Sequence, residues 1–203
     1  MRFMNTELEF WYEFASTYSY LSVMRIEGLA RSEGVSVKWR PFLLGPVFKS
    51  QGWNTSPFNI YVSKGKYMWR DIERLSAKYE IPLSRPTEFP RNGLLAARAA
   101  LVADAEGWCG EFSKLVFRAN FAEDRDISDE AVIASILDSL GKSAADVLAQ
   151  ARSEEIKLKL RAQTERAQEL GIFGAPTFIA RGEIFWGNDR LDDAIDWLKR
   201  GTG

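Results

Sequence analysis

The residue with the clearest chemical potential near the start of the chain is Ser16. It lies where an aromatic-rich stretch, residues 8–14, gives way to a sequence typical of a helix from about residue 18. Free N–H groups and aligned peptide dipoles at a helix start favour an anion. A hydroxyl there can also donate a hydrogen bond to a thiolate or an oxyanion. Because serine is an ordinary helix N-cap, this segment alone leaves capping and catalysis both open.

A second candidate is the segment over residues 171–178, which reads Gly-Ile-Phe-Gly-Ala-Pro-Thr-Phe. Pro176 stands between a helix and a strand, where proline is commonly only a structure breaker. A cis Ala175–Pro176 bond would instead expose the backbone groups of Ala175. Those groups could pair with a peptide-like ligand as with an added strand. We predict that this bond is cis.

The third candidate is the sequence Gly-Asn-Asp-Arg at residues 187–190. Asn188 or Asp189 is expected to cap the last helix. The functional interpretation is that the helix start near Asn188 holds a carboxylate while Asp189 binds an ammonium group. A ligand that carries both groups is an amino acid or a γ-glutamyl moiety.

Two scarcities limit the chemistry. The 203 residues include no histidine and a single cysteine, Cys109. Histidine-based triads, histidine metal sites, disulfides within the chain, Cys-x-x-Cys redox chemistry and thiolate zinc sites are therefore excluded. We expect no metal site, and we expect Cys109 to be a buried small residue without a function. Enzyme activity must then use other polar side chains or an external cofactor.

Charge and hydropathy exclude two classes of partner. The 27 basic and 28 acidic residues give a net charge of −1, which provides no electrostatic basis for binding nucleic acid or an anionic membrane. No apolar run approaches the ~20 residues that span a bilayer. Residues 1–9 lack the apolar core of a signal peptide. We therefore expect a cytoplasmic protein with neither a nucleic-acid nor a membrane partner.

The three candidate segments need a framework that brings them together. Residues 8–14, 18–31 and 35–40 read as strand, helix and strand, which make a βαβ unit. Residues 177–180 and 183–186 read as a hairpin before the last helix. Helices are expected between these two ends, at residues 64–79, 94–104, 112–121, 128–140, 143 onward and 153–170. The sequence thus predicts an α/β fold in which both ends form one sheet.

The sheet and the helices are expected to make a single domain. Its sheet part spans about residues 7–60 and 155–203, and an all-helical insertion spans about residues 61–154. Residues 41–57 contain several glycines and prolines and are expected to form a loop. Serines are expected to cap three of the helices, namely Ser128, Ser143 and Ser153.

Taken together and in this order, the three candidate segments resemble the DsbA-like thioredoxin superfamily. Within it, the sequence resembles the 2-hydroxychromene-2-carboxylate isomerases and the kappa-class glutathione transferases. Further matching stretches are Trp-Arg-Pro-Phe-Leu-Leu-Gly at 39–45, Phe-Pro-Arg-Asn at 89–92, Arg-Asp-Ile-Ser at 125–128 and Phe-Trp-Gly at 185–187. The resemblance runs from about residue 8 to residue 200. Thr17 and Trp53 depart from the family pattern.

This resemblance implies a thioredoxin-like sheet domain with an inserted helical subdomain, bound glutathione and a homodimer. Ser16 is then the catalytic residue, since it stands where a redox relative carries its first cysteine, and it stabilises the glutathione thiolate. The implied glutathione-binding residues are Ser16, Asn54, Lys64, Ala175, Pro176, Asn188 and Asp189. The substrate is implied to be a small aromatic carboxylate, bound by Lys49, Arg91 and Asn92.

The implied activity is a glutathione-dependent isomerisation of 2-hydroxychromene-2-carboxylate, or of a similar aromatic-derived hemiketal, by reversible thiolate addition. The helix start and Ser16 would lower the pKa of the thiol, so no protein base is expected to be needed. A kappa-type glutathione transferase or peroxidase is the first alternative, although the stretch at 89–92 favours the isomerase. The alternative from another class is a non-catalytic module that binds glutathione or a peptide.

Overall fold

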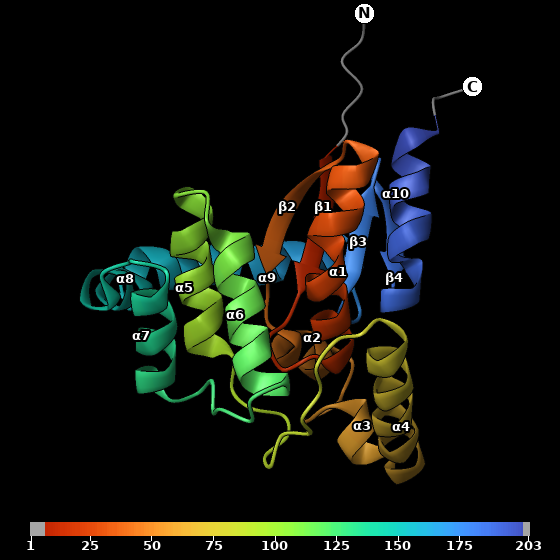
Figure 1. Ribbon diagram of the computed structural model, residues 1–203, viewed down its shortest axis with the longest axis horizontal. Coiled ribbons are helices and arrows are strands. Elements are labelled where there is room, and N and C mark those ends of the chain that lie inside the picture. Colours follow the sequence, from red (N-terminus) through yellow and green to blue (C-terminus); the bar gives the residue numbers. More distant parts are fainter. Residues whose placement is uncertain (1–6, 201–203) are drawn as a thin grey trace, which may run out of the picture.

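A parallel strand pair joined by a helix forms the N-terminal part of the sheet (Figure 1). The computed structural model describes residues 7–200. Strand β1 (Glu7–Tyr12) pairs in parallel with β2 (Ser36–Pro41), and helix α1 (Thr17–Glu33) connects them. Every side chain of β1 from Phe10 onward is buried, as expected for a strand that is covered on both faces.

The C-terminal part of the chain completes the same sheet. Strand β3 (Thr177–Ala180) pairs antiparallel with β1, and β4 (Glu183–Trp186) pairs antiparallel with β3. The strand order is therefore β2-β1-β3-β4. The predicted α/β class, and the union of both ends of the chain in one sheet, are confirmed.

Helices surround this sheet, and most of them lie between β2 and β3 in the chain. Figure 1 shows α5 to α8 grouped on one side of the sheet, with α3 and α4 near the end at which β1 stops. The bounds are α2 (Leu44–Ser50), α3 (Pro57–Ile60), α4 (Val62–Lys78), α5 (Leu94–Ala105), α6 (Cys109–Phe121), α7 (Glu130–Ser139), α8 (Ala144–Ala151), α9 (Glu154–Glu169) and α10 (Leu191–Lys199). Within residues 7–200, no helix is both long and apolar enough to cross a bilayer.

Alternating residues of β1 belong to two separate cores. Phe10 stacks on Tyr12 and on Phe178 of β3, with ring centroids 4.9 and 5.3 Å apart, in the larger core that includes α1, α6 and α10. Trp11 points to the opposite face and packs in a smaller core. The buried hydroxyl of Tyr12 also lies 2.7 Å from that of Ser113 in α6. This contact ties the helices of the middle of the chain to the central strand.

Local details differ from the sequence predictions at three places. The expected loop over residues 41–57 contains α2, because Pro46 lies in the first helical turn, where proline needs no N–H partner. Ser128 does not cap α7, since Asp129 does so by accepting from the Ala131 N–H. The last helix begins one or two residues later than expected, because residues 188–190 form a 3-10 turn before α10.

The expected cap at the last helix is therefore wrong, while two other caps are confirmed. Arg190 is the N-cap residue of α10, and neither Asn188 nor Asp189 accepts a hydrogen bond from its first turn. Ser143 and Ser153 do cap α8 and α9 through hydrogen bonds from Asp146 N–H and Ile156 N–H.

Candidate functional site

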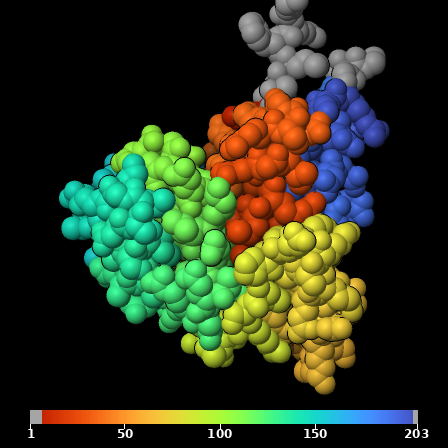
Figure 2. Space-filling view, viewed as in Figure 1, coloured from red at the N-terminus to blue at the C-terminus, as the bar shows by residue number. Residues whose placement is uncertain are grey.

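A large pocket opens at the end of the sheet where β1 stops and α1 begins. Its volume is about 1420 Å³, which exceeds the roughly 300–1,000 Å³ of common small-molecule sites. Its walls come from the start of α1, the segment from α2 to α4, the turn before α5, and the turns before β3 and after β4. Figure 2 shows α3 and α4, in gold and yellow, projecting from the rest of the molecule. Segments far apart in the sequence thus share one cavity.

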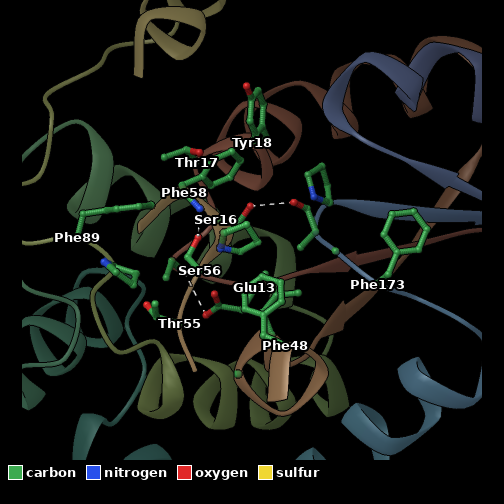
Figure 3. Close-up of a pocket in the computed structure, with 18 of the residues that line it drawn as sticks. Glu13, Ser16, Thr17, Tyr18, Phe48, Thr55, Ser56, Phe58, Phe89 and Phe173 are labelled. Atoms are coloured by element: carbon green, nitrogen blue, oxygen red, sulfur yellow. Dashed lines mark hydrogen bonds between the residues drawn. The ribbon is translucent and has the colours of Figure 1, made fainter. Parts of the chain in front are cut away.

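Ser16 lies in the middle of this pocket and is the N-cap of α1 (Figure 3). Its N–H donates to the Glu13 carbonyl at 2.9 Å, and its Oγ accepts from the Ser19 N–H at 3.1 Å. The hydroxyl itself donates to the Ala175 carbonyl at 3.1 Å. The first N–H groups of α1 have no helical partner and can bind an anion. Ser16 therefore combines the capping role with a half-buried hydroxyl beside an anion-binding helix start.

The turn that leads into β3 brings Ala175 and Pro176 to the same wall. The Ala175–Pro176 bond is cis, as predicted from the sequence. Thr177 Oγ1 donates to the Gly174 carbonyl at 2.8 Å, and the Gly187 N–H donates to the Pro176 carbonyl at 3.0 Å. The carbonyl of Ala175 already accepts the Ser16 hydroxyl, so backbone pairing with a ligand at this residue stays a prediction.

Asn188 and Asp189 lie next to that turn and differ sharply in exposure. Asn188 is 2% exposed, and its Oδ1 accepts from Ser22 Oγ at 3.1 Å and from Arg25 Nη1 at 3.3 Å. The amide nitrogen of Asn188 is buried and has no partner among residues 7–200. The Asp189 side chain is 72% exposed and pairs with Arg190 at 3.2 Å. One buried donor and one exposed carboxylate therefore stand side by side on the pocket wall.

Three further residues suggested by the resemblance line the pocket, namely Asn54, Lys64 and Asn92. Asn54 is exposed, and the neighbouring Trp53 does not remove it from the wall but packs on Phe48, with ring centroids 5.9 Å apart. The Lys64 ammonium is also exposed and lies 4.7 Å from the centre of the Tyr61 ring. The Asn92 side chain accepts from the Leu94 N–H at 2.9 Å, where α5 begins.

Lys49 does not reach the pocket. Helix α2 turns Leu44 and Phe48 toward the cavity, four residues apart on one helical face, and Lys49 lies exposed on the adjacent face. The structure does not place Lys49 at this pocket, and its contact with a substrate stays a prediction. Its helix was read as a loop, so the sequence offered no basis for the direction of this side chain.

Arg91 lies at the pocket wall, but its guanidinium bonds to other groups of the protein. The residue is 6% exposed and forms an ion pair with Asp124. It also donates to the Asn120 side chain at 3.2 Å and to the Arg125 carbonyl at 2.9 Å. A cation with these internal partners is not free to bind a substrate carboxylate. These partners give Arg91 a structural role, and its expected contact with a substrate stays a prediction.

Glu13 is a pocket residue that the sequence reading missed. It follows β1 directly, three positions before Ser16, and its carboxylate accepts from the Ala15 N–H at 3.2 Å. Burial raises the pKa of Glu13 to about 7, an effect that the N–H groups of Ala15 and Phe14 oppose. The available signal was an acidic residue inside the aromatic stretch over residues 8–14, where a buried strand would ordinarily carry apolar side chains.

Aromatic rings surround these polar groups. Figure 3 shows Phe48, Phe58, Phe89 and Phe173 around Ser16 and Glu13, each from a different segment of the chain. The exposed Trp186 also contributes to the wall, where it packs on Phe173 with ring centroids 4.9 Å apart. A wall of this kind suits a ligand with a flat unsaturated ring.

Comparison with protein families places almost the whole described chain in one of them. Residues 7–199 match the DSBA-like thioredoxin domain. Among known proteins, a 2-hydroxychromene-2-carboxylate isomerase of Sphingobium xenophagum is 32% identical over 196 residues, which are 96% of this chain and 99% of that protein. Glutathione S-transferase kappa 1 of Rattus norvegicus is 28% identical and covers 91% of this chain and 87% of its own.

Solved structures give the same result. A structure of 2-hydroxychromene-2-carboxylate isomerase superimposes with a TM-score of 0.86 at 26% identity, over 96% of both chains. A probable DsbA oxidoreductase from Streptomyces coelicolor superimposes with a TM-score of 0.76 at 19% identity, over 97% of this chain and 92% of its own, and shares the fold. The predicted thioredoxin-like, DsbA-like fold is thereby confirmed.

Proposed function

Because the chain belongs to the 2-hydroxychromene-2-carboxylate isomerase family of DSBA-like thioredoxin domains, we propose that it is a glutathione-dependent isomerase. Its substrate is 2-hydroxychromene-2-carboxylate or a similar aromatic-derived hemiketal. The observation that carries the proposal is the position of Ser16, a pocket hydroxyl at the start of α1 in a chain with no cysteine there. A hydroxyl at a helix start stabilises a thiolate that the protein itself does not supply.

The pocket residues fit glutathione at its γ-glutamyl end. The buried amide nitrogen of Asn188 lacks a hydrogen-bond partner within residues 7–200, and such a group is costly to leave unpaired. An α-carboxylate would satisfy it. The exposed Asp189 carboxylate, on the next residue, is the partner for the α-ammonium group. Ala175 and Pro176 would hold the peptide backbone, and Asn54 and Lys64 would hold the remainder of the molecule.

Glutathione bound at this site would supply a nucleophilic thiolate for reversible addition to the unsaturated substrate. Ser16 stabilises that charge when its hydroxyl turns from the Ala175 carbonyl to the sulfur. A charge-assisted hydrogen bond of this kind contributes about 1.5–3 kcal/mol, or about one to two units of thiol pKa. The dipole at the start of α1 acts in the same direction.

The substrate ring would lie among the aromatic side chains opposite Ser16. Its carboxylate needs a cation, and the internal partners of Arg91 leave Lys64 as the best candidate in the described part of the wall. Arg190 also lines the pocket but already pairs with Asp189 and Asp193. Asn92 would contribute a polar contact to the substrate.

A kappa-type transferase or peroxidase is the second candidate, since relatives named glutathione S-transferase kappa match over nearly the whole chain. A module that only binds glutathione or a peptide is the candidate from another class. Assays with glutathione and 2-hydroxychromene-2-carboxylate, a chlorinated aromatic compound or cumene hydroperoxide separate the three. The proposal expects turnover of the first substrate to exceed that of the others. Faster conjugation or peroxide reduction would assign the kappa-type activity instead, and no turnover of any substrate would indicate a binding module.

We also propose a homodimer in the cytoplasm. Large apolar side chains are exposed on α3 and α4, which project from the body of the molecule (Figure 2). They are Ile60, Tyr61, Val62 and Tyr67. Contiguous exposed apolar side chains are typical of protein interfaces. Sedimentation velocity is expected to give twice the 23.0 kDa mass of one chain, and a species with the mass of a single chain at micromolar concentration would refute the dimer.

A further inference from the structure

One short turn fixes both Glu13 and Ser16 against the pocket. The Ser16 N–H donates to the backbone carbonyl of Glu13 at 2.9 Å, which closes the turn between β1 and α1. The Ala15 N–H, inside the same turn, donates to the Glu13 carboxylate at 3.2 Å. Both side chains line the cavity, as Figure 3 shows. The acid and the hydroxyl therefore share one hydrogen-bonded turn and line one cavity.

The surroundings of Glu13 leave part of its carboxylate unused. Oε1 accepts from the Ala15 N–H, the Phe14 N–H also lies close to the carboxylate, and no ion pair involves Glu13 within residues 7–200. Gly93 approaches so closely that a Cβ there would lie 3.0 Å from Oε1. The other ionisable groups of the pocket wall are Tyr18, Lys64, Tyr67, Asp71, Arg91, Asp189 and Arg190. Within the described residues, Glu13 is thus a half-buried acid of the pocket wall without a charged partner.

We propose that Glu13 accepts the thiol proton of glutathione bound at Ser16, an inference that rests on the proposed function. The S–H bond breaks, an O–H bond forms on the Glu13 carboxylate, and the electron pair stays on sulfur. Glu13 returns the proton to the sulfur before glutathione leaves, so the cycle closes without an outside acid or base. Ser16 stabilises the resulting thiolate, and Glu13 takes the proton that its formation releases.

The proton affinity of Glu13 suits this step. A base works best when its pKa lies near the working pH, and burial raises the pKa of Glu13 to about 7. The chain has no histidine that could serve instead. Burial and the hydrogen bond to Asp71 raise the pKa of Tyr18, so that hydroxyl stays protonated near neutral pH and cannot act as the base. Glu13 revises the earlier expectation that no protein base is needed.

Proton counting during glutathione binding tests the proposal without turnover. Calorimetry in two buffers with different ionisation enthalpies gives the number of protons released, and ultraviolet absorbance of the same samples reports the thiolate. At about pH 8, free Glu13 is mostly ionised, while the glutathione thiol, whose pKa lies somewhat above the ~8.5 of cysteine, is mostly protonated. The wild-type protein is expected to form thiolate and release almost no proton, because the thiolate charge raises the pKa of Glu13 further and Glu13 retains the proton.

Glu13→Gln keeps an oxygen for the Ala15 N–H and removes the base. This variant is expected either to release about one proton for each thiolate formed or to form far less thiolate. Asp71→Asn, which removes another carboxylate of the same wall, is the matched control and is expected to behave as wild type. Thiolate formation with about one proton released by the wild-type protein would overturn the role of Glu13 alone. Absence of glutathione binding and thiolate would overturn the proposed function together with it.

Discussion

The hydroxyl of Ser16 has a structural task and a proposed chemical one, and the structure separates them. Its oxygen accepts the Ser19 N–H as a helix cap, while its hydrogen points to the Ala175 carbonyl and is available to a ligand. Removal of the side chain affects both. A control must therefore lose a cap without touching the pocket.

Ser16→Ala is expected to lower turnover by about 10- to 100-fold, the effect of one charge-assisted hydrogen bond. The free energy of unfolding should fall by only about 1 kcal/mol through loss of the cap. Ser153→Ala, which removes the equivalent cap from α9, should lose similar stability and keep full turnover. Steady-state kinetics and urea denaturation on both variants make the comparison. Equal turnover in the two variants would leave Ser16 with capping alone.

The ionisation of Glu13 should also change the free energy of unfolding of the ligand-free protein. Its folded-state pKa of about 7 lies above the ordinary value of 4.5, so the folded state binds this proton more tightly than the unfolded state. Ionising Glu13 therefore lowers the free energy of unfolding. This loss begins as the pH rises above 4.5 and is complete above about 7. Glu13→Gln removes this cost.

The Glu13→Gln variant is expected to be about 1–3 kcal/mol more stable than wild type near pH 8, a range reduced from the full shift because the side chain is partly exposed. The gain should fade at about pH 4, where wild-type Glu13 is protonated in both states. Urea denaturation of both proteins at the two pH values measures this difference in stability. A difference that does not change with pH would show that Glu13 does not titrate as described.

Asp189 tests the proposed γ-glutamyl site. Asp189→Asn removes the charge partner of the ammonium group and should weaken glutathione binding by about 5- to 10-fold, a modest loss because the carboxylate is 72% exposed. Asp193→Asn is a matched control, since Asp193 also pairs with Arg190 but lies outside the pocket wall. Calorimetry with glutathione measures both. Equal losses in the two variants would assign the effect to Arg190.

Arg91 connects the turn before α5, which borders the pocket, with the end of α6 and the loop that follows it. The residue precedes α5, and its partners Asn120, Asp124 and the Arg125 carbonyl lie at the end of α6 and just beyond it. The Thr87 N–H and the Arg91 guanidinium keep the pKa of Asp124 below its usual value. Asn120 in turn donates to the Phe14 carbonyl at 3.0 Å, in the turn before Ser16. Arg91 thus supports the active-site turn indirectly.

Arg91→Ala is expected to lower the free energy of unfolding by about 3–5 kcal/mol, because it leaves buried polar partners without their cation. Arg118→Ala removes a neighbouring arginine whose side chain is 49% exposed and should change stability by under about 1 kcal/mol. Urea denaturation measures both changes. A stable Arg91→Ala protein with a raised KM for the substrate would contradict the structural role and support the substrate-binding role predicted from the sequence.

The sequence predicted the elements with strong periodic patterns and missed those with weak ones. The strands and the long helices have clear apolar periods, and their positions are confirmed within a few residues. Helix α2 has only seven residues and contains a glycine and a proline, so its local signal is that of a loop. The direction of the Lys49 side chain depends on that helix and could not be predicted for the same reason.

The pocket is a property of the whole molecule. Ser16 and Ala175 are 159 residues apart in sequence, yet the pairing of β1 with β3 brings them into hydrogen-bond contact. Each motif could be recognised in the sequence, and the family resemblance predicted that the motifs belong to one site. The internal partners of Arg91 and the burial of Glu13 depend on packing between distant segments, which no local pattern encodes. Sequence reasoning therefore missed Glu13 and did not foresee the internal partners of Arg91.

The proposed function treats glutathione as a catalyst that is released unchanged, which distinguishes an isomerase from a transferase. The decisive measurement is the amount of 2-hydroxychromene-2-carboxylate isomerised by the protein when glutathione is far less abundant than substrate. We expect many product molecules per glutathione, undiminished free thiol at the end, and no reaction above background when glutathione is left out. Product that stops at one molecule per glutathione, with loss of free thiol, or isomerisation that proceeds equally well without glutathione, would contradict the proposed function.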